Sequence, residues 1–384
     1  MKISAASRTR SRVLTELLPG RSYSRTELAR KTGLSAPTVS RVTRQLLKGA
    51  VLRERRADRP RGKGPSQRLE VNGARGSILG ISLLPPLARV LVLDLQGAVL
   101  KEVREPVSWN HGRAGLLDPL KRAVRRSLKE WPAGRPRAIG AGLALPGRWD
   151  KERGVSLAYP RVRAWKDVPI RAMIEEWTRC PAVLIGYGPA LAAAEQSRRP
   201  LPEPRHLISV EAADNIAMGA VANGALVEGA SGNAGELGHI QVGAAGPVCY
   251  CGNAGCLEAL ATCSSVVEEM KQSDAAPSPI TYESVVGLAR EGDLFCARTL
   301  GRAARALGAG LAVVLNLFNP EVLVLNGRFF EAGDLVMAPL LASLHERALS
   351  SKTAPLTIER STLGGPAAAL GAGIAAIRSA LHRL

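Results

Sequence analysis

The 384-residue sequence has few aromatic residues, few acidic residues and no long apolar run. Phe, Trp and Tyr make up 4% of the chain, whereas 46% is hydrophobic and 39 residues are glycine. This composition is typical of globular α/β proteins and excludes fibrous and disordered classes. The first residues, MKISAASRTRSR, lack the apolar core of a signal peptide, and no segment reaches the ~20 apolar residues that a bilayer crossing requires. We therefore expect a cytoplasmic protein with reduced thiols and no membrane contact.

Acidic residues are scarcest at the N-terminus, where basic residues are concentrated. The chain has 52 Lys and Arg against 33 Asp and Glu, a net charge of +19. Residues 1–75 hold 19 of these basic residues and 5 of the acidic ones, so the remaining 309 residues carry an excess of only 5 positive charges. A compact basic segment on a nearly neutral body predicts a polyanion-binding domain joined to something else.

Helix start and stop signals in the basic segment follow one another at short intervals. Ser24 and Glu27 have the spacing of a capping box, and Gly33 is a typical left-handed helix stop. Ser35 can cap a second helix after this short turn, and Pro37 is tolerated in its first turn. With an earlier helix over residues 13–18, the spacing predicts the three helices of a helix-turn-helix.

The second helix of this pair has an apolar stripe and a polar face. Val39, Val42 and Leu46 recur at helical spacing and are expected to be buried. Two short alternating segments, VLRERR and RLEV, flank a basic Gly/Pro loop and predict a β-hairpin wing. The predicted contacts with double-stranded operator DNA, in the major groove and at the wing, are Ser35, Thr38, Ser40, Arg41, Arg44, Lys48, Arg59, Arg61 and Lys63. A small helical protein-interaction domain is the alternative.

From about residue 76 short strands alternate with helices. Strands are predicted over 77–83, 88–95, 98–103, 138–145 and 182–185, with helices over 116–130 and 170–177 between them. A second round has strands over 206–210, 215–222, 225–230, 321–327 and 356–359. The pattern predicts two α/β lobes. The expected domains are a winged helix-turn-helix over 1–75, a first lobe over 76–200 and a second lobe with the dimer interface over 201–365, with the C-terminal helix (366–384) packed back on the first lobe.

Three of the six cysteines cluster near a histidine. Cys249, Cys251, Cys256 and His239 supply the thiolates and imidazole that Zn²⁺ accepts in a closed tetrahedral structural site. Gly252 and Gly255 let the chain turn sharply between them. Free structural thiols are the alternative reading. The other three cysteines, Cys180, Cys263 and Cys296, are expected to be ordinary buried thiols.

The segments SGNAGELGHIQV and CYCGNAGCLEALAT closely resemble the signature region of the ROK family of bacterial repressors and sugar kinases. GAGLALPG resembles the Pro-Gly strand end of that family, and RGKGPSQRLEVN resembles the wing of its repressor branch. The resemblance implies two lobes of the ribonuclease H-like, actin-like kind and a structural zinc at the four positions above. It also implies that Glu236, His239 and Glu258 contact sugar hydroxyls; taken alone, the two acids could equally be surface or helix-capping residues.

The resemblance fails at the positions that matter for phosphoryl transfer. The family has an Asn and a catalytic Asp where this chain has Gly186 and Tyr187, and a phenol is a poor base at neutral pH. The glycine-rich phosphate turns are replaced by SLLPPLAR and SVEAADNIAMG, in which Glu211 and Asp214 would repel phosphate and proline offers no N–H. No catalytic residue and no kinase activity are therefore expected.

These features predict a DNA-binding transcriptional regulator of the ROK type, most simply a repressor acting as a homodimer or tetramer. Tyr187 and Arg161, the latter at a position where the family often has Asn, could adapt the pocket to a phosphorylated or acidic effector, or could fill it. The alternatives are a ligand-independent DNA-binding dimer with a zinc-stabilised scaffold, and an ATP-dependent sugar kinase with a DNA-binding appendage.

Overall fold

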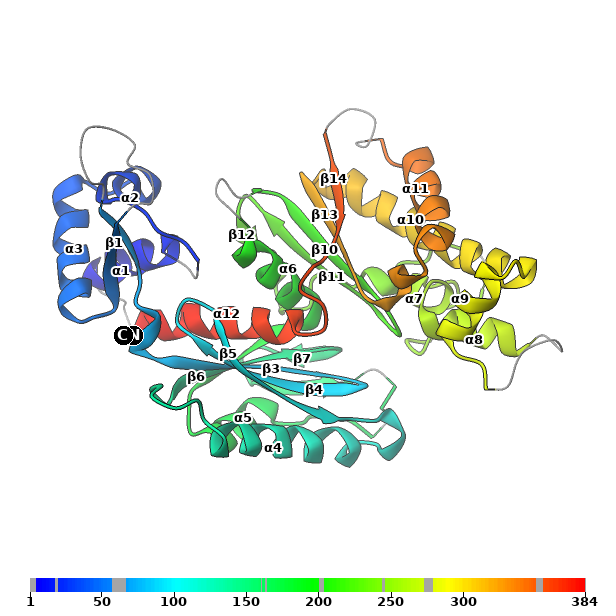
Figure 1. The fold of residues 1–384 in the computed structure, drawn as a ribbon, viewed down its shortest axis with the longest axis horizontal. Helices are drawn as coiled ribbons and strands as arrows, with labels where there is room; N and C mark the ends of the chain where they lie inside the picture. Colours follow the sequence, from blue (N-terminus) through cyan, green and yellow to red (C-terminus); the bar gives the residue numbers. More distant parts are fainter. Residues whose placement is uncertain are drawn as a thin grey trace. The chain divides into compact units, whose positions relative to one another are not determined.

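The computed structural model describes residues 5–17, 20–56, 67–159, 161–162, 164–199, 204–243, 246–272, 279–349 and 355–383. The chain divides into two compact units, whose elements are labelled in Figure 1. Unit 1 comprises Met1–Ile185 and Ala368–Leu384, and unit 2 comprises Gly186–Ala367.

Unit 1 begins with three helices and a two-stranded antiparallel sheet. The elements are α1 (Ala5–Glu16), α2 (Arg25–Thr32), α3 (Ala36–Lys48), β1 (Leu52–Arg56) and β2 (Gln67–Val71). Leu52 pairs with Val71, and Arg56 with Gln67. Tyr23 extends this sheet, since its N–H and C=O bond the C=O and N–H of Leu69 at 3.1 and 2.7 Å. The strand segments and the order helix, turn, helix, hairpin agree with the sequence prediction.

The predicted helix signals around α2 and α3 are confirmed. The Ser24 hydroxyl accepts a hydrogen bond from the Glu27 N–H (3.2 Å), and the Glu27 carboxylate accepts one from the Ser24 N–H (2.8 Å). Gly33 adopts φ 63°, which glycine reaches without a Cβ clash. The first helix was predicted too late and too short, because only its C-terminal part is apolar. Its polar N-terminal turns gave no periodic signal.

A small core joins the helices to the hairpin. Val39, Val42 and Leu46 of α3 are buried as predicted, at 0, 5 and 3% exposure. The other buried apolar residues of this part are Val13, Leu14, Leu17, Tyr23, Leu28, Val51, Leu52, Leu69 and Val71. The N-terminal segment therefore has an apolar interior of its own.

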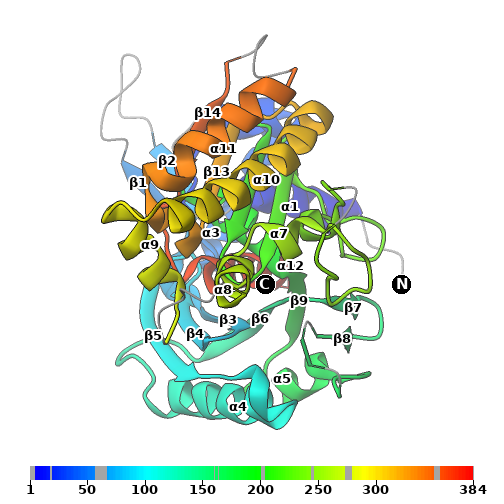
Figure 2. The same cartoon turned by 90° about the vertical axis from the view of Figure 1, so that its right-hand side faces the viewer.

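The first large sheet has the strand order β5-β4-β3-β6-β9. The strands are β3 (Ser77–Leu84), β4 (Leu87–Asp94), β5 (Val99–Pro106), β6 (Ala138–Leu145) and β9 (Ala182–Gly186). β3 runs antiparallel to β4 and parallel to β6. Helices α4 (Ala114–Lys129) and α5 (Ile170–Thr178) lie on one face of the sheet, and α12 (Ala367–Arg383) lies on the other (Figures 1 and 2). A short hairpin that the sequence analysis missed, β7 (Arg148–Asp150) and β8 (Val155–Ala158), follows β6.

Glycine at one sheet position allows α12 to approach the backbone of β6. A Cβ at Gly142 would overlap the carbonyl oxygen of Ala372 and would crowd the Ala376 methyl group. The C-terminal helix thus packs on the sheet of unit 1, although the whole of unit 2 lies between β9 and this helix along the chain.

The second large sheet has the order β12-β11-β10-β13-β14. Its strands are β10 (Leu207–Ala212), β11 (Ile216–Ala222), β12 (Ala225–Leu226), β13 (Val322–Asn326) and β14 (Thr357–Arg360). Helix α6 (Tyr187–Arg198) covers one face, and α10 (Leu294–Phe318) and α11 (Asp334–Arg347) cover the other (Figure 1). Three further helices follow β12 along the chain and precede α10: α7 (Leu257–Leu260), α8 (Cys263–Lys271) and α9 (Tyr282–Arg290).

Two boundaries in unit 2 differ from those predicted. Unit 2 begins at Gly186, whereas the predicted first lobe extends to residue 200, because α6 packs on β10 and β11. Gly188 of α6 and Gly219 of β11 are in such close contact that a Cβ on either would overlap the backbone of the opposite element. The strand predicted over 225–230 is only two residues long, since the chain leaves the sheet after Leu226.

Among the described residues, α10 is long and apolar enough to cross a membrane by length and composition alone. The sequence analysis did not single it out, because arginines interrupt its N-terminal half. Its residues Leu300, Leu307 and Leu311 are fully buried in the core of unit 2, whereas apolar residues at its two ends, such as Leu294 and Leu317, are exposed. The greater part of the apolar window of this helix is therefore buried, as in the core helix of a globular protein.

Candidate DNA-binding surface, metal centre and effector residues

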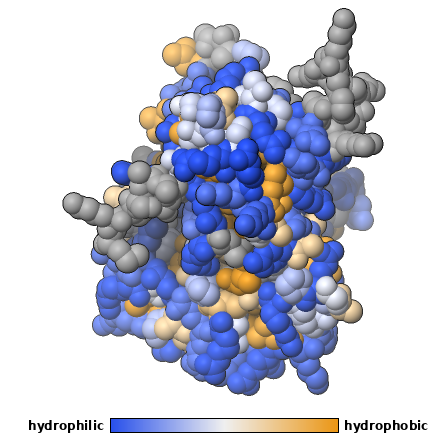
Figure 3. Space-filling view, turned by 90° about the vertical axis from the view of Figure 1, so that its left-hand side faces the viewer, coloured by the Kyte–Doolittle hydropathy of each residue, from blue (hydrophilic) through white to orange (hydrophobic). Residues whose placement is uncertain are grey.

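Helix α3 carries its buried and exposed residues on different faces. Val39, Val42 and Leu46 face the small core, whereas Arg41, Arg44 and Lys48 are exposed. Seen from the side on which α3 lies in Figure 1, the surface of the molecule is mostly hydrophilic (Figure 3). α3 therefore presents three cations to solvent from a helix fixed by its apolar stripe.

The predicted polar contacts at the start of α3 also stabilise the helix. Ser35 is its N-cap, and its hydroxyl accepts a hydrogen bond from the Thr38 N–H at 3.4 Å. The two hydroxyl oxygens of Ser35 and Thr38 are 2.8 Å apart. Ser40 is half-buried, and its carbonyl accepts a hydrogen bond from the Thr43 hydroxyl at 3.3 Å. Ser35 and Thr38 therefore take part in capping α3. In any contact with DNA the same two hydroxyl groups would have to serve both purposes.

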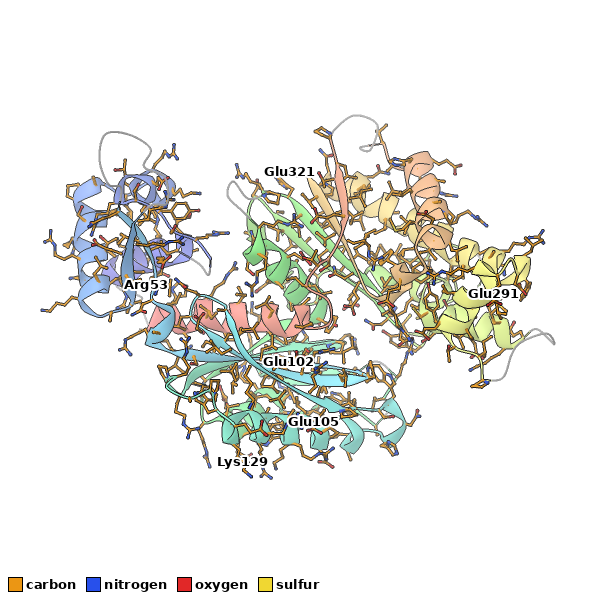
Figure 4. All side chains as sticks on the ribbon, viewed as in Figure 1. Arg53, Glu102, Glu105, Lys129, Glu291 and Glu321 are labelled. Carbon is orange, nitrogen blue, oxygen red and sulfur yellow. The ribbon has the colours of Figure 1, made fainter. Side chains whose placement is uncertain are left out.

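Several arginines of the N-terminal segment are paired with acids. Arg53, labelled in Figure 4, donates to Glu70 at 2.7 Å. Arg25 pairs with Glu54 at 2.9 Å and Arg68 with Glu27 at 3.2 Å. The predicted wing contacts Arg59, Arg61 and Lys63 lie outside the described residues.

The four predicted metal ligands come together in unit 2. One ligand atom from each of His239, Cys249, Cys251 and Cys256 lies within 4.8 Å of the others. The sulfurs of Cys251 and Cys256 are 3.7 Å apart, as are the Cys249 sulfur and Nδ1 of His239. Within the described residues this is the one group of three or more such side chains that could hold a metal ion.

Local backbone structure brings the four residues together. His239 ends a 3₁₀ turn (Leu237–His239), and Cys256 is the N-cap of α7. The Cys249 N–H donates to the Asn253 carbonyl at 2.7 Å, which closes a tight loop. Gly252 and Gly255 adopt φ of 97° and 73°, in agreement with the sharp turns that the sequence analysis assigned to them.

The donor set matches a thiolate-binding metal. Burial and the neighbouring thiols raise the pKa of Cys256 to about 12, because adjacent sulfurs cannot all ionise without a cation between them. Three sulfurs and one imidazole nitrogen are ligands that soft or borderline metals prefer. The other cysteines, Cys180, Cys263 and Cys296, are buried as predicted.

The second nitrogen of His239 points away from the thiols. Nε2 is 3.0 Å from the hydroxyl of Tyr250 and 4.0 Å from the carboxylate of Glu236. The imidazole ring of His239 and the phenol ring of Tyr250 meet edge to face, with their centroids 5.2 Å apart. Sequence reasoning missed Tyr250, although its position between two cysteine ligands was a signal that its side chain would lie near the cluster.

The two acids named by the resemblance differ in their surroundings. Glu236 is exposed, whereas Glu258 is buried and its carboxylate accepts a hydrogen bond from the Ile216 N–H at 3.0 Å. Partial desolvation raises the pKa of Glu236, and so does the charge of Glu258, while His239 opposes the shift. Glu258 thus also anchors the start of β11.

Tyr187 begins α6 and contacts a carboxylate on β10. Its hydroxyl donates to Glu211 Oε2 at 3.4 Å. Burial raises the pKa of Glu211 to about 7, and the hydrogen bond from Tyr187 opposes this shift. Sequence reasoning treated Glu211 only as a residue that would repel phosphate and did not pair it with Tyr187. The close packing of Gly188 against Met218 holds the helix start beside the sheet.

The turn after β10 is closed by an internal ion pair. Arg328 donates to both carboxylate oxygens of Asp214, at 2.8 and 2.9 Å, and Ser264 donates to the same carboxylate at 2.7 Å. In unit 1 the corresponding turn, between β3 and β4, contains Pro85 and Pro86. Neither turn has the glycine-rich backbone that brings a run of N–H groups close to phosphate.

Arg161 lies in unit 1 and is exposed. Its guanidinium carbon is 6.0 Å from the ring centroid of Trp109. Its φ of 61° is unusual for a residue other than glycine or asparagine.

The fold and these residues define a two-unit α/β protein with a basic N-terminal helical segment and a His-Cys₃ group. A family model described as the ROK family matches residues 87–379, so the chain belongs to the ROK family. The matched range includes the His-Cys₃ group and most of both large sheets.

Relatives of known name cover nearly the whole chain. The xylose repressor of Caldicellulosiruptor bescii is 28% identical over 370 residues, covering 94% of this chain and 92% of the relative. The DNA-binding transcriptional dual regulator NagC of Escherichia coli is 25% identical, covering 88% and 85%.

Among solved structures, a ROK family transcriptional regulator, described as a homologue of an E. coli MLC protein, has a TM-score of 0.79 at 24% identity and covers 98% of this chain and 96% of its own. The ROK hexokinase of Thermus thermophilus has a TM-score of 0.66 at 30% identity and covers 78% and 97%. Regulators and kinases thus share the fold of the body.

Proposed function

We propose that the chain is a cytoplasmic, DNA-binding transcriptional repressor whose N-terminal segment is a winged helix-turn-helix. The observation that carries the proposal is α3, which buries Val39, Val42 and Leu46 and exposes Arg41, Arg44 and Lys48. A helix fixed on one face and cationic on the other suits the major groove of DNA. The repressor names of relatives that cover most of the chain support the same function.

The coverage of the two solved structures also supports a regulator. The regulator structure covers 98% of the chain and the hexokinase 78%. The difference of 20% is about 77 of the 384 residues, which is close to the length of the basic N-terminal segment. The hexokinase thus covers about as much of the chain as remains when this segment is left out.

The contacts with DNA divide by chemistry. Arg41, nearest the start of α3, has the bidentate guanidinium that suits a guanine edge, whereas Arg44 and Lys48 suit phosphates. The wing residues Arg59, Arg61 and Lys63 are proposed as further phosphate or minor-groove contacts. Ser35, Thr38 and Ser40 are proposed to add short-range contacts at the helix start.

The experiment is selection of genomic fragments retained by the purified full chain, followed by fluorescence anisotropy with the strongest fragment. Arg41→Ala should weaken binding by roughly 5- to 150-fold, the effect of losing one good base contact. Lys48→Ala should lower the salt slope by about 1, because one phosphate contact is lost.

Arg104→Ala is the matched control. Arg104 is an exposed arginine on β5 that pairs with Glu102 at 3.6 Å. Its replacement should leave binding unchanged. Equal affinity of the full chain for every fragment at moderate salt, or equal losses in the control and in Arg41→Ala, would refute the proposal.

We also propose that His239, Cys249, Cys251 and Cys256 hold one structural Zn²⁺. When bound, such an ion supplies a closed tetrahedral crosslink and no reaction chemistry. Elemental analysis should find one zinc per chain, and Cys251→Ser should lose it. Cys180→Ser is the control, because the Cys180 sulfur lies outside the group and contacts the Ala138 carbonyl. A metal content that is equal in both variants would count against the site.

The candidate metal centre and the residues around it are proposed to bind a carbohydrate-related effector. Glu236, His239 and Glu258 supply carboxylate and imidazole groups, and Tyr187 adds a phenol. Calorimetric titration with D-xylose and N-acetylglucosamine, with and without operator DNA, tests this. Binding that weakens operator affinity supports effector control. Absence of binding by either sugar would instead favour a ligand-independent repressor in which the Tyr187 hydroxyl and the Glu211 carboxylate pair with each other.

Loss of kinase activity is part of the proposal. Tyr187 stands where the family has its base, and the two turns that would cradle phosphate contain prolines in one case and the Asp214–Arg328 ion pair in the other. Incubation with ATP and the same sugars should give no sugar phosphate. Robust turnover would favour the alternative function, that of a sugar kinase, since the chain is similar to a hexokinase.

A homodimer is proposed because one helix-turn-helix reads too few base pairs alone. An exposed apolar patch in unit 2 suits a second copy of the chain. Val313 and Leu317 of α10 are exposed by 38 and 74%, and Leu349 by 71%. Asn316 fixes this patch: its side chain donates to the Arg347 carbonyl (3.3 Å) and accepts from the Leu349 N–H (2.8 Å).

A further inference from the structure

The loop that carries the clustered cysteines of unit 2 also carries a tyrosine in contact with the fourth candidate ligand. The hydroxyl oxygen of Tyr250 lies 3.0 Å from Nε2 of His239, and the two rings meet edge to face. The other ring nitrogen of His239, Nδ1, is 3.7 Å from the Cys249 sulfur. The imidazole is therefore held between the sulfurs on one side and a phenol hydroxyl on the other.

Backbone hydrogen bonds fix the chain next to the imidazole, but they do not orient the ring. The Leu257 N–H donates to the Ile240 carbonyl at 2.9 Å. The Val242 N–H donates to the Gly255 carbonyl at 3.1 Å. These bonds hold the backbone that follows His239 against the start of α7. The ring can still turn about its two side-chain torsions, so its direction depends on what its nitrogens contact.

Tyr250 is presented by a tight loop. The Cys249 N–H donates to the Asn253 carbonyl at 2.7 Å, and the Gly252 N–H donates to the Cys249 carbonyl at 2.9 Å. Gly252 has φ 97°, a conformation that residues with a Cβ rarely adopt. The tyrosine side chain is half-exposed and is not part of the core. The loop therefore places the phenol beside the imidazole without burying it.

A neutral histidine that binds a metal through one nitrogen carries its proton on the other. With Nδ1 directed to the thiols, Nε2 carries the N–H and requires a hydrogen-bond acceptor, which a phenol oxygen supplies. Such an outer partner fixes the tautomer and the orientation of a metal-binding imidazole. The carboxylate of Glu236 is 4.0 Å from Nε2, beyond hydrogen-bonding distance. The oxygen of Tyr250 is therefore the better placed of these two acceptors.

We propose that Tyr250 is a positioning residue of the candidate metal centre: its oxygen accepts the hydrogen bond of Nε2 and thereby directs Nδ1 of His239 at the metal. This inference rests on the proposed Zn²⁺ site and deepens it, since it assigns a role to a side chain that is not itself a ligand. An effector hydroxyl that reached Nε2 would have to take over this hydrogen bond from Tyr250.

The test is the affinity of the purified full chain for Zn²⁺, measured by competition with a chromophoric chelator. Tyr250→Phe keeps the aromatic ring beside the imidazole and removes only the hydroxyl. It should lower the Zn²⁺ affinity roughly 10- to 100-fold, the usual effect of losing an outer partner of a ligand. Val248→Ala is the matched control, because Val248 is an exposed residue of the same loop without a hydrogen-bonding side chain. The control should bind Zn²⁺ as tightly as the unchanged chain.

Two further measurements separate orientation of the imidazole from other effects. Co²⁺ in place of Zn²⁺ gives visible absorption bands that respond to the geometry of the ligands. Tyr250→Phe loaded with Co²⁺ should show shifted bands, because its imidazole is no longer held in place. Glu236→Gln tests the competing acceptor and should change the Zn²⁺ affinity less than Tyr250→Phe does.

Three results would overturn the proposal. They are an equal Zn²⁺ affinity of Tyr250→Phe and the unchanged chain, a lower affinity of Tyr250→Phe with unshifted Co²⁺ bands, and a loss in Glu236→Gln as large as that in Tyr250→Phe. The second result would mean that the hydroxyl stabilises the loop and does not orient the imidazole. Each of these results sinks this inference alone, because the unchanged chain still binds Zn²⁺. Absence of Zn²⁺ binding in the unchanged chain sinks the proposed metal site and this inference with it.

Discussion

Replacing Glu211 with glutamine should stabilise the protein at alkaline pH and leave its stability at acidic pH unchanged. Burial raises the pKa of Glu211 from 4.5 to about 7, against the opposing hydrogen bond from Tyr187. The folded chain therefore holds this proton more tightly than the unfolded chain. Below pH 4.5 both states are protonated, and as the pH rises to 7 only the unfolded state loses its proton, so stability falls with rising pH.

The size of the effect follows from the two pKa values. A difference of one in pKa corresponds to ~1.4 kcal/mol, so a rise from 4.5 to about 7 gives at most about 3 kcal/mol at alkaline pH. A glutamine at this position has nearly the same size as the native glutamate, has no charge to desolvate and can still accept the Tyr187 hydrogen bond. The variant should thus be more stable than the unchanged chain by about 1–3 kcal/mol near pH ~8.5, and equal to it within error near pH ~4.5.

The assay is urea unfolding at about pH 4.5, 7 and 8.5, followed by circular dichroism, so that the three points span the two pKa values. All five tryptophans lie in unit 1, so tryptophan fluorescence recorded in parallel reports that unit. Glu291→Gln is the control, because Glu291, labelled in Figure 4, is exposed at the end of α9. Parallel pH profiles for Glu211→Gln and the unchanged chain, or a variant that is less stable at the alkaline point, would refute the reasoning.

Three further predictions concern stability and assembly. Ser35→Ala removes the α3 cap and should cost ~1 kcal/mol in denaturant unfolding of the N-terminal segment; an unchanged midpoint would mean that the Thr38 N–H finds another partner. Gly142→Ala should lower the thermal midpoint, since its Cβ overlaps the Ala372 carbonyl and such overpacking costs ~1–3 kcal/mol; a rise would show that α12 is not seated on β6. Leu317→Arg should leave the fold intact and convert the proposed dimer to a monomer in sedimentation, with weaker operator binding; an unchanged mass would count against the proposed interface.

Local signals were sufficient to predict α2, α3 and the hairpin of the N-terminal segment. The capping box at Ser24, the glycine stop at Gly33 and the stripe of Val39, Val42 and Leu46 each depend on residues a few positions apart. The predicted strands of both sheets were found for the same reason, because alternation and β-branched runs are local patterns. Three features were not predicted, because none has a strong local pattern. They are the polar start of α1, the short β7–β8 hairpin and the early end of β12.

The pairings across the chain could not be predicted in this way. Tyr187 and Glu211 are on different elements, and so are Asp214 and Arg328, and their contacts depend on how α6 and β13 pack against β10. The contact of His239 with Tyr250 is between residues close in sequence, but it required the turns around the cysteines to form.

The sequence by itself determined the basic, helical N-terminal segment, the order of most strands and helices, and the identity of the four candidate metal ligands. These depend on composition, periodicity and spacing along the chain. Only the tertiary structure decided that α6 belongs to the second sheet, how closely α12 approaches the first, and that Arg161 stacks on Trp109. Those outcomes depend on close backbone approach and on side chains that lie far apart in sequence, which no local pattern records.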